Sequence, residues 1–312
     1  MTGIDLQRGL EREPWARFVE QSPQSTVFCH PAFLDALPVR WEVRHVERAG
    51  VPVAAAVVLR GTRGEVLSAP HPFTMYQGIL LARSITEGPA HRSVPAVLQA
   101  ITELLAGLEP EGRISLCLHP SFPDLRPFSW FHYHTAALGR FALDLRYTGL
   151  VPLGEPGGFD AVLAGVRSVR RQEYRKAKER FETAPSDDLD LLDDLHARTF
   201  ARQGIERPAE EAALLRAIVS AALKSGLGEM IVARDGSGQV ASAAVFLSDH
   251  RTTYYLVAAN APEHRNAGTS TLLLLEGARR GCERGLQALD VVGMNSPGRG
   301  DFKASFGAVP AP

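Results

Sequence analysis

The chain has 312 residues, of which 45% are hydrophobic and 22% charged, and its formal net charge is −1. These fractions are typical of folded globular proteins and exclude disordered and collagen-like chains, while the neutral balance argues against a dedicated nucleic-acid coat protein. No apolar run reaches the roughly 18 residues of a membrane span, and the start lacks a signal-peptide pattern. The three widely spaced cysteines fit reduced thiols, so we expect a cytoplasmic protein with no membrane span.

The first half of the sequence predicts a loose alternation of helices and strands. A helix is expected to open at Pro31, because proline favours the first helical turn. The elements expected after it are a hairpin of strands 41–47 and 51–60, a helix at 94–108 and a strand at 113–118. Residues 68–78 are rich in proline, histidine and aromatic residues, which is more than a plain connection needs.

Glycine and proline are densest at residues 149–158, where we expect a domain junction that divides the chain into 1–150 and 151–312. The second part opens with a basic helix, 163–180, which holds seven Arg or Lys against two Glu. Ser186 is expected to cap the helix after it. The elements expected next are helices at 190–203 and 209–225, strands at 229–233, 240–248 and 252–259, a helix at 269–284 and a strand at 288–292.

This order of two helices, three antiparallel strands, a helix and a strand resembles the GNAT acyltransferase fold. After Asp290 and a glycine turn, Phe302-Lys303-Ala304-Ser305-Phe306-Gly307 resembles the closing signature of the FemAB/FemX-like family. The basic segment 170–177, the helix end 200–204 and the segment 26–34 are similar to further parts of that family.

The resemblance implies an α/β (α+β) fold of two tandem GNAT-like domains, each with a mixed, mostly antiparallel sheet flanked by helices. It also implies an enzyme, an amide-forming aminoacyl or acyl transferase. Many members of the family take an aminoacyl group from aminoacyl-tRNA to build peptidoglycan bridges or to modify small natural products. The expected partners are therefore aminoacyl-tRNA as donor and a small-molecule amine as acceptor, with acyl-CoA as the alternative donor and no resident cofactor.

Lys303 is the candidate catalytic residue. Forming an amide from an ester or thioester requires a positioned neutral amine, a stabilised oxyanion and a protonated leaving group. An ammonium is a compact, movable charge that can stabilise the oxyanion or a leaving phosphate, and the family resemblance carries the same lysine. The alternative is a solvated surface lysine, but the flanking Phe302 and Phe306 indicate local packing, and the chain has only four lysines.

One candidate for donor binding is the loop before the helix at 269–284. The spacing of Arg265, Gly268 and Ser270 is close to the GNAT loop whose amides bind a pyrophosphate at a helix N-terminus. An ordinary N-cap has the same residues, so the motif alone leaves both interpretations open. Such a loop fits either CoA or the 3′ end of tRNA.

The second candidate for donor binding is the basic helix. Arg170, Arg171 and Arg175 could contact RNA phosphates, although a run of charges is more often a solvated face. On the first interpretation, reversing the three charges should weaken donor binding and leave the fold intact.

The acceptor is expected between the two halves, because a cleft between domains is the default ligand site. Tyr76 from the first half and Arg202 and Tyr255 from the second are candidates for lining it. Asn295 and Phe302 are further candidate substrate-binding residues. The two adjacent tyrosines of one strand point to opposite faces, so we expect one ring in the core and one in the cleft.

No metal is expected, because His132 and His134 have no third ligand near them in the sequence. The sequence also lacks the short motifs of serine hydrolases, P-loop NTPases, dinucleotide-binding dehydrogenases and zinc proteases. Three functions stay open: a FemX-like N-acyltransferase that uses aminoacyl-tRNA, an N-acyltransferase that uses acyl-CoA, and a non-catalytic module whose loop 68–78 holds a ligand.

Overall fold

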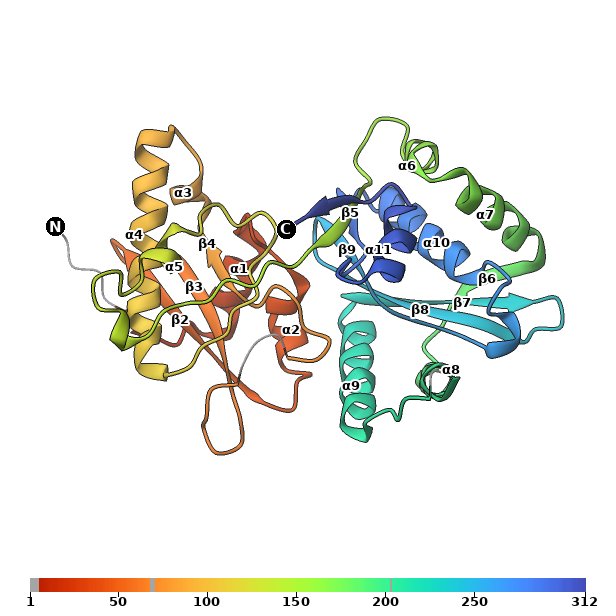
Figure 1. Cartoon of the computed structure of the whole chain (residues 1–312), viewed down its shortest axis with the longest axis horizontal. Coiled ribbons are helices and arrows are strands. Elements are labelled where there is room, and N and C mark those ends of the chain that lie inside the picture. Colours follow the sequence, from red (N-terminus) through yellow and green to blue (C-terminus); the bar gives the residue numbers. More distant parts are fainter. Residues whose placement is uncertain (1–5, 68–70, 203) are drawn as a thin grey trace. The chain divides into compact units, whose positions relative to one another are not determined.

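The computed structural model describes the chain except residues 1–5, 68–70 and 203. The chain forms two compact units, Met1–Asp144 and Leu145–Pro312 (Figure 1). The division at 144 comes slightly before the expected junction. The whole segment 149–158 and the whole of strand β5 (Thr148–Pro152) therefore belong to the second unit.

The first unit is built on a four-stranded antiparallel sheet in the order β1-β2-β3-β4. Its strands are β1 (Leu6–Arg8), β2 (Arg40–Arg48), β3 (Val51–Arg60) and β4 (Ile79–Leu81). The expected hairpin is confirmed, since β2 pairs with β3 along its length. Ala49 and Gly50 between them have positive φ angles of 50° and 74°, as a tight two-residue hairpin turn requires.

Helices and short turns complete the first unit. They are α1 (Arg12–Gln21), η1 (Val27–Cys29), α2 (Pro31–Leu34), α3 (Arg83–Thr86), α4 (Ala90–Leu108), η2 (Glu109–Glu111), α5 (Arg126–Trp130) and η3 (Ala136–Leu138). The apolar side of α4, which includes Val97, Ile101 and Leu104, packs on the sheet in one core.

The strand expected at 113–118 is wrong, because these residues join neither sheet of the described chain. Ile114, Leu116 and Leu118 do pack against the core of the first unit. The alternation of apolar residues therefore reflects burial of one side of the segment and not pairing with a neighbouring strand.

The second unit is built on a seven-stranded sheet in the order β11-β5-β10-β9-β8-β7-β6. The strands not yet given are β6 (Phe181–Pro185), β7 (Gly228–Asp235), β8 (Val240–Ser248), β9 (Thr252–Asn260), β10 (Ala288–Asp290) and β11 (Val309–Ala311). All neighbours are antiparallel except β9 and β10, which run parallel. The mixed sheet agrees with the expected fold class.

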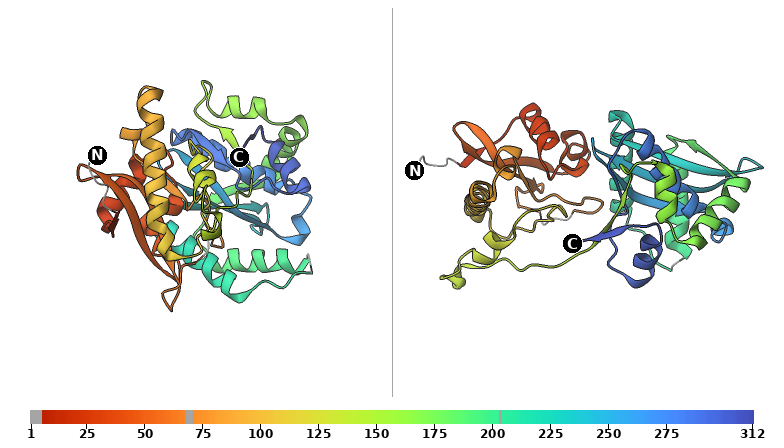
Figure 2. Two further views of the ribbon diagram at one scale, coloured as in Figure 1. Left: turned by 60° about the vertical axis from the view of Figure 1, so that its left-hand side comes forward. Right: turned by 90° about the horizontal axis from the view of Figure 1, so that it is seen from above.

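Helices cover both faces of this sheet. They are α6 (Phe159–Gly165), α7 (Ser168–Arg180), α8 (Leu189–Arg202), α9 (Ala209–Ser225), η4 (Pro262–His264), α10 (Thr269–Glu283) and α11 (Pro297–Ala304). Figures 1 and 2 show α7 and α10 on one face and α8 and α9 on the other. Among the described residues, no helix has both the length and the apolar character needed to cross a membrane.

Two local expectations in the second unit are wrong. The basic helix is interrupted at Val166, whose φ of −76° and ψ of 136° are extended, so that α6 and α7 are separate. Ser186 does not cap α8; the carboxylate of Asp188 accepts a 2.9 Å hydrogen bond from the backbone N–H of Leu191, three residues on. This is the geometry of an N-cap aspartate.

Candidate active site

The parallel strands β9 and β10 form a fork in the sheet of the second unit. They pair only at Thr252–Tyr254 and Ala288–Asp290, although β9 continues to Asn260. Opposite β8, β9 also has one extra residue, because Tyr255 and Val257 face consecutive residues of β8. In the described chain, the edge of β9 beyond the paired residues has no neighbouring strand on its β10 side.

Part of the unpaired edge of β9 is accessible to solvent. Residues 256–258 of β9 are partly exposed, whereas residues 241–248 of the adjacent β8 are all buried. Unpaired backbone groups on one strand edge can accept or donate hydrogen bonds to a bound molecule. The opening lies at the carboxyl ends of a parallel pair, where ligands of open α/β sheets usually bind.

The N-terminus of α10 adjoins the end of β9. The Asn260 side chain donates a 2.8 Å hydrogen bond to Ser270 Oγ and accepts one of 3.0 Å from Thr269 Oγ1. The first backbone N–H groups of a helix have no acceptor within the helix, and its dipole favours an anion there. Gly268 and Ser270 therefore belong to an ordered helix start, and the nearby Arg265 is exposed.

Lys303, on α11, is held in a specific position and is not a solvated surface lysine. Its half-buried ammonium donates hydrogen bonds to the carbonyl oxygens of Val292 and, at 2.9 Å, Gly293. Both carbonyls belong to the turn that follows β10, one wall of the fork. Burial lowers the pKa of Lys303 to about 8; the Asp290 carboxylate opposes this shift and Arg299 adds to it. Lys303 is therefore still mainly an ammonium at neutral pH.

Asn295 and Phe302, the other two candidates in this segment, make contacts within the protein. The Asn295 side chain accepts a 2.7 Å hydrogen bond from the backbone N–H of Tyr147 and donates one of 3.0 Å to its carbonyl. Phe302 packs edge-on against Phe306 at 5.0 Å, and the Arg170 guanidinium lies 4.8 Å from its ring centre. Both side chains therefore shape the segment that carries Lys303.

The basic helix α7 presents only part of its charge to solvent. Arg170 Nε donates a 3.1 Å hydrogen bond to Ser305 Oγ, and its Nη1 lies 2.6 Å from a Glu173 carboxylate oxygen. Arg171 donates a 2.6 Å hydrogen bond to the carbonyl of Val166 at the end of α6. Reversing either charge would break these contacts and should lower the free energy of unfolding, so that the intact fold of such a variant stays a prediction. Arg175 is exposed, with no hydrogen bond or ion pair to another described side chain.

Both tyrosines of β9 are buried, so the expectation that one ring faces a cleft is wrong. Tyr255 is 9% exposed and its ring lies 5.5 Å from that of Phe246 in the core, and this burial raises its pKa. Tyr254 is fully buried and donates a 2.7 Å hydrogen bond to Asp249.

The other two candidate acceptor residues differ in exposure. Tyr76, in the first unit, is 8% exposed and packs edge-on against Phe28 and His119. Arg202 is exposed at the end of α8. Their roles, like that of Tyr255, stay predictions.

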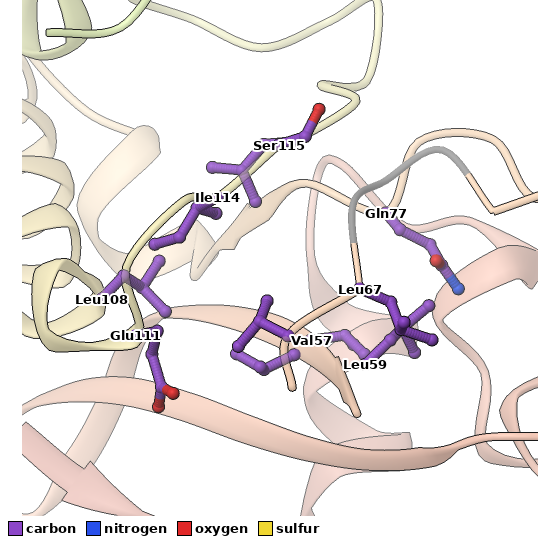
Figure 3. A pocket seen from close by; sticks show the side chains of 11 residues that line it. Val57, Leu59, Leu67, Gln77, Leu108, Glu111, Ile114 and Ser115 are labelled. Atoms are coloured by element: carbon purple, nitrogen blue, oxygen red, sulfur yellow. The ribbon is translucent and has the colours of Figure 1, made fainter. Parts of the chain in front are cut away.

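The first unit has a narrow pocket of its own, whose accessible interior of about 20 Å³ has room for about one water molecule. Its lining is mainly apolar and includes Val57, Leu59 and Ile114, with Glu111 and Gln77 as polar members (Figure 3). Gln77 comes from the segment 68–78 that the sequence singled out and is 2% exposed. Its amide donates a 3.0 Å hydrogen bond to the carbonyl of Phe28, while its Oε1 has no partner within the described chain. Residues 68–70 of the same segment lie outside the described residues.

Within the described ranges, no three His, Cys, Asp or Glu side chains cluster as metal ligands would. His132 lies 3.1 Å from a Glu109 carboxylate oxygen, and its other ring nitrogen lies 2.9 Å from the carbonyl of Gly139.

Comparison with known proteins agrees with this architecture. Residues 164–304 match the acetyltransferase (GNAT) domain family. The solved structure of FemX, at 13% identity, covers 98% of this chain and 95% of its own with a TM-score of 0.71. L-PGS from Bacillus licheniformis is 12% identical and covers 98% and 91% with a TM-score of 0.54. A tandem GNAT protein from the clavulanic acid biosynthesis pathway is 14% identical and covers 99% and 96% with a TM-score of 0.51. Curated protein sequences give no match.

The match places a domain of the GNAT acetyltransferase type at residues 164–304, within the second unit. The likeness over nearly the whole length shows that the chain shares the fold of FemX and of the tandem GNAT protein. The expected fold class and the expectation of an amide-forming transferase are thereby confirmed.

Proposed function

We propose that the protein transfers an aminoacyl group from aminoacyl-tRNA to an amine of a small molecule or a cell-wall precursor. The observation that carries this proposal is the Lys303 ammonium, which is held by two carbonyl groups on one wall of the fork. An ammonium has three N–H donors, so one remains for a substrate oxygen. The FemX-like fold supports aminoacyl-tRNA as donor, through the family resemblance of the segment around Lys303.

The reaction joins the acceptor nitrogen to the ester carbonyl carbon. Attack by the neutral amine forms the C–N bond and places a negative charge on the carbonyl oxygen. The C–O bond to the terminal ribose of the tRNA then breaks, and the proton lost by the amine goes to the leaving oxygen. The Lys303 ammonium stabilises the charge that develops on the oxyanion or on the leaving end of the tRNA, including its phosphate.

The donor is proposed to lie between the N-terminus of α10 and α11. The amides at Gly268 to Ser270 and the exposed Arg265 are suited to a phosphate of the tRNA 3′ end. Of the three candidate arginines on α7, Arg175 is the exposed one and is suited to a further RNA phosphate.

On the acceptor side, the exposed Arg202 is suited to an anionic group of the substrate, such as a phosphate or carboxylate. Tyr76 and Tyr255 would have to reorient to contact it, because less than a tenth of each residue is exposed. Asn295 and Phe302 are proposed to act by shaping the site and not by direct binding.

An acyl-CoA-dependent N-acyltransferase is the second candidate. The helix start at Gly268 to Ser270 supports it equally, because the pyrophosphate of CoA is also an anion. Acetyl-CoA is the thioester donor to test here, since the structure of the similar tandem GNAT protein from the clavulanic acid pathway is distinguished as the form without AcCoA.

The experiment compares both donors with the same acceptors. Transfer is measured from tRNA charged with radiolabelled amino acids and from acetyl-CoA, to primary amines that include a nucleotide-linked cell-wall peptide with a free lysine side chain. We expect a product larger by one aminoacyl group, formed only with charged tRNA and abolished by RNase. Transfer from acetyl-CoA alone would establish the second candidate. Binding of an amine without transfer from either donor would identify a non-catalytic module.

A further inference from the structure

The turn after β10 has an unusual backbone. Val292 has a φ of +51°, which is rare for a β-branched residue and costs free energy. In this conformation the carbonyls of Val292 and Gly293 both accept hydrogen bonds from Lys303 Nζ. A strained turn of this kind persists only where its surroundings hold it.

Asp290 and Thr148 hold this turn. Asp290 is 2% exposed, and its Oδ1 accepts hydrogen bonds from the backbone N–H of Val292 at 2.7 Å and from Thr148 Oγ1 at 2.5 Å. Thr148 Oγ1 in turn accepts one of 3.2 Å from the N–H of Gly293. Val292 and Gly293 therefore bind Lys303 through their carbonyls and are fixed in place by the hydrogen bonds of their own N–H groups.

Strand β5 and the residue that precedes it, Tyr147, complete the contact with the turn. The N–H of Val291 donates to the carbonyl of Gly149 at 2.9 Å, and that of Met294 donates to the carbonyl of Tyr147 at 2.7 Å. Gly149 permits this approach, because a Cβ atom there would clash with Met294 Sδ and lie 3.0 Å from Val291 Cγ2.

We propose that Asp290 and Thr148 are positioning residues for Lys303: they hold the turn so that its two carbonyls fix the place of the ammonium at the fork. The expected effect on kcat rests on the proposed function. The expected effect on the position and titration of Lys303 does not. Asp290 has an electrostatic role in addition, since it and Arg299 are the charged groups that act on Lys303. Loss of its negative charge leaves burial and Arg299 unopposed and moves the titration of Lys303 to lower pH.

The test observes Lys303 without relying on activity. The chain has only four lysines, so the NMR spectrum of protein labelled with ¹³C-lysine contains few Cε signals. The signal that is missing in Lys303→Met belongs to Lys303. We expect Asp290→Asn to move the titration of that signal below its wild-type pH. Thr148→Val keeps the carboxylate, so it should not lower the titration, but it should reduce kcat about tenfold at similar KM. Thr148→Ser keeps the hydroxyl and should restore most of the rate.

The matched control is Ser248→Ala, which removes another buried hydroxyl of the same sheet, at the end of β8, where Ser248 accepts a 3.2 Å hydrogen bond from Arg284. It should leave both the Lys303 titration and kcat unchanged. The proposal is overturned if Asp290→Asn leaves the titration unchanged, or if Ser248→Ala reduces kcat as much as Thr148→Val does. If Lys303→Met keeps full activity while Asp290→Asn still shifts the titration, the proposed function fails and the positioning role stands.

Discussion

Replacing Lys303 by Met tests the central assignment, because methionine keeps the length of the side chain and removes the charge and all three donors. Loss of one preorganised donor to a developing oxyanion typically costs about 2.7–4 kcal/mol, so kcat should fall on the order of 10²–10³ with a smaller change in KM. The carbonyls of Val292 and Gly293 lose their partner as well. A buried acceptor without a partner costs about 1–3 kcal/mol, but both residues are partly exposed and water can reach them. The free energy of unfolding should therefore fall by only about 1–2 kcal/mol.

Two measurements check this prediction: single-turnover transfer from charged tRNA, and unfolding in urea. Lys224→Met is the control, because Lys224 is exposed in the last turn of α9. It should change neither quantity. If Lys303→Met unfolds more easily yet transfers at the wild-type rate per folded molecule, Lys303 is structural and the mechanism loses its only catalytic group.

Three further predictions concern pH, salt and packing. Because the active form of Lys303 is the ammonium and its pKa is about 8, the rate should fall as pH rises through that value; in Lys303→Arg the rate should be lower but free of this fall, and a fall that persists would refute the assignment. Arg175→Glu should raise the donor KM and reduce the salt dependence by about one phosphate contact, at unchanged stability, whereas Lys224→Glu should do neither. Gly149→Ala should reduce both stability and kcat, because its Cβ would displace the turn. Gly277→Ala, whose Cβ would clash with the Phe246 ring, should reduce stability alone. Equal kcat values per folded molecule in the two variants would contradict this prediction.

The local pattern of the sequence determined most of the second unit. The helix expected at 209–225 and the strand expected at 240–248 have those bounds in the structure, because helix and strand periodicity, together with the turn residues between them, are local properties. The resemblance around Lys303 also located the catalytic candidate, since its motif lies within six consecutive residues. The segment 113–118 failed because the same alternation suits any chain that buries one side.

Only the tertiary structure decided which of the candidate residues are available. Arg170, Arg171 and Arg175 look alike in the sequence, and the packing of α7 against α6 and α11 is what leaves only the last exposed. Asn295 has the chemistry of a substrate ligand, but the Tyr147 backbone lies beside it in the fold and satisfies its amide.

The support of Lys303 was likewise invisible in the sequence. Thr148 lies 142 positions before Asp290, and no pattern of a few residues records a contact over that distance. The lowered pKa has the same origin, because it depends on burial that several separate segments create around the ammonium. The order of helices and strands is determined by neighbouring residues. The position and charge state of the candidate catalytic group depend on distant segments that meet only in the folded protein.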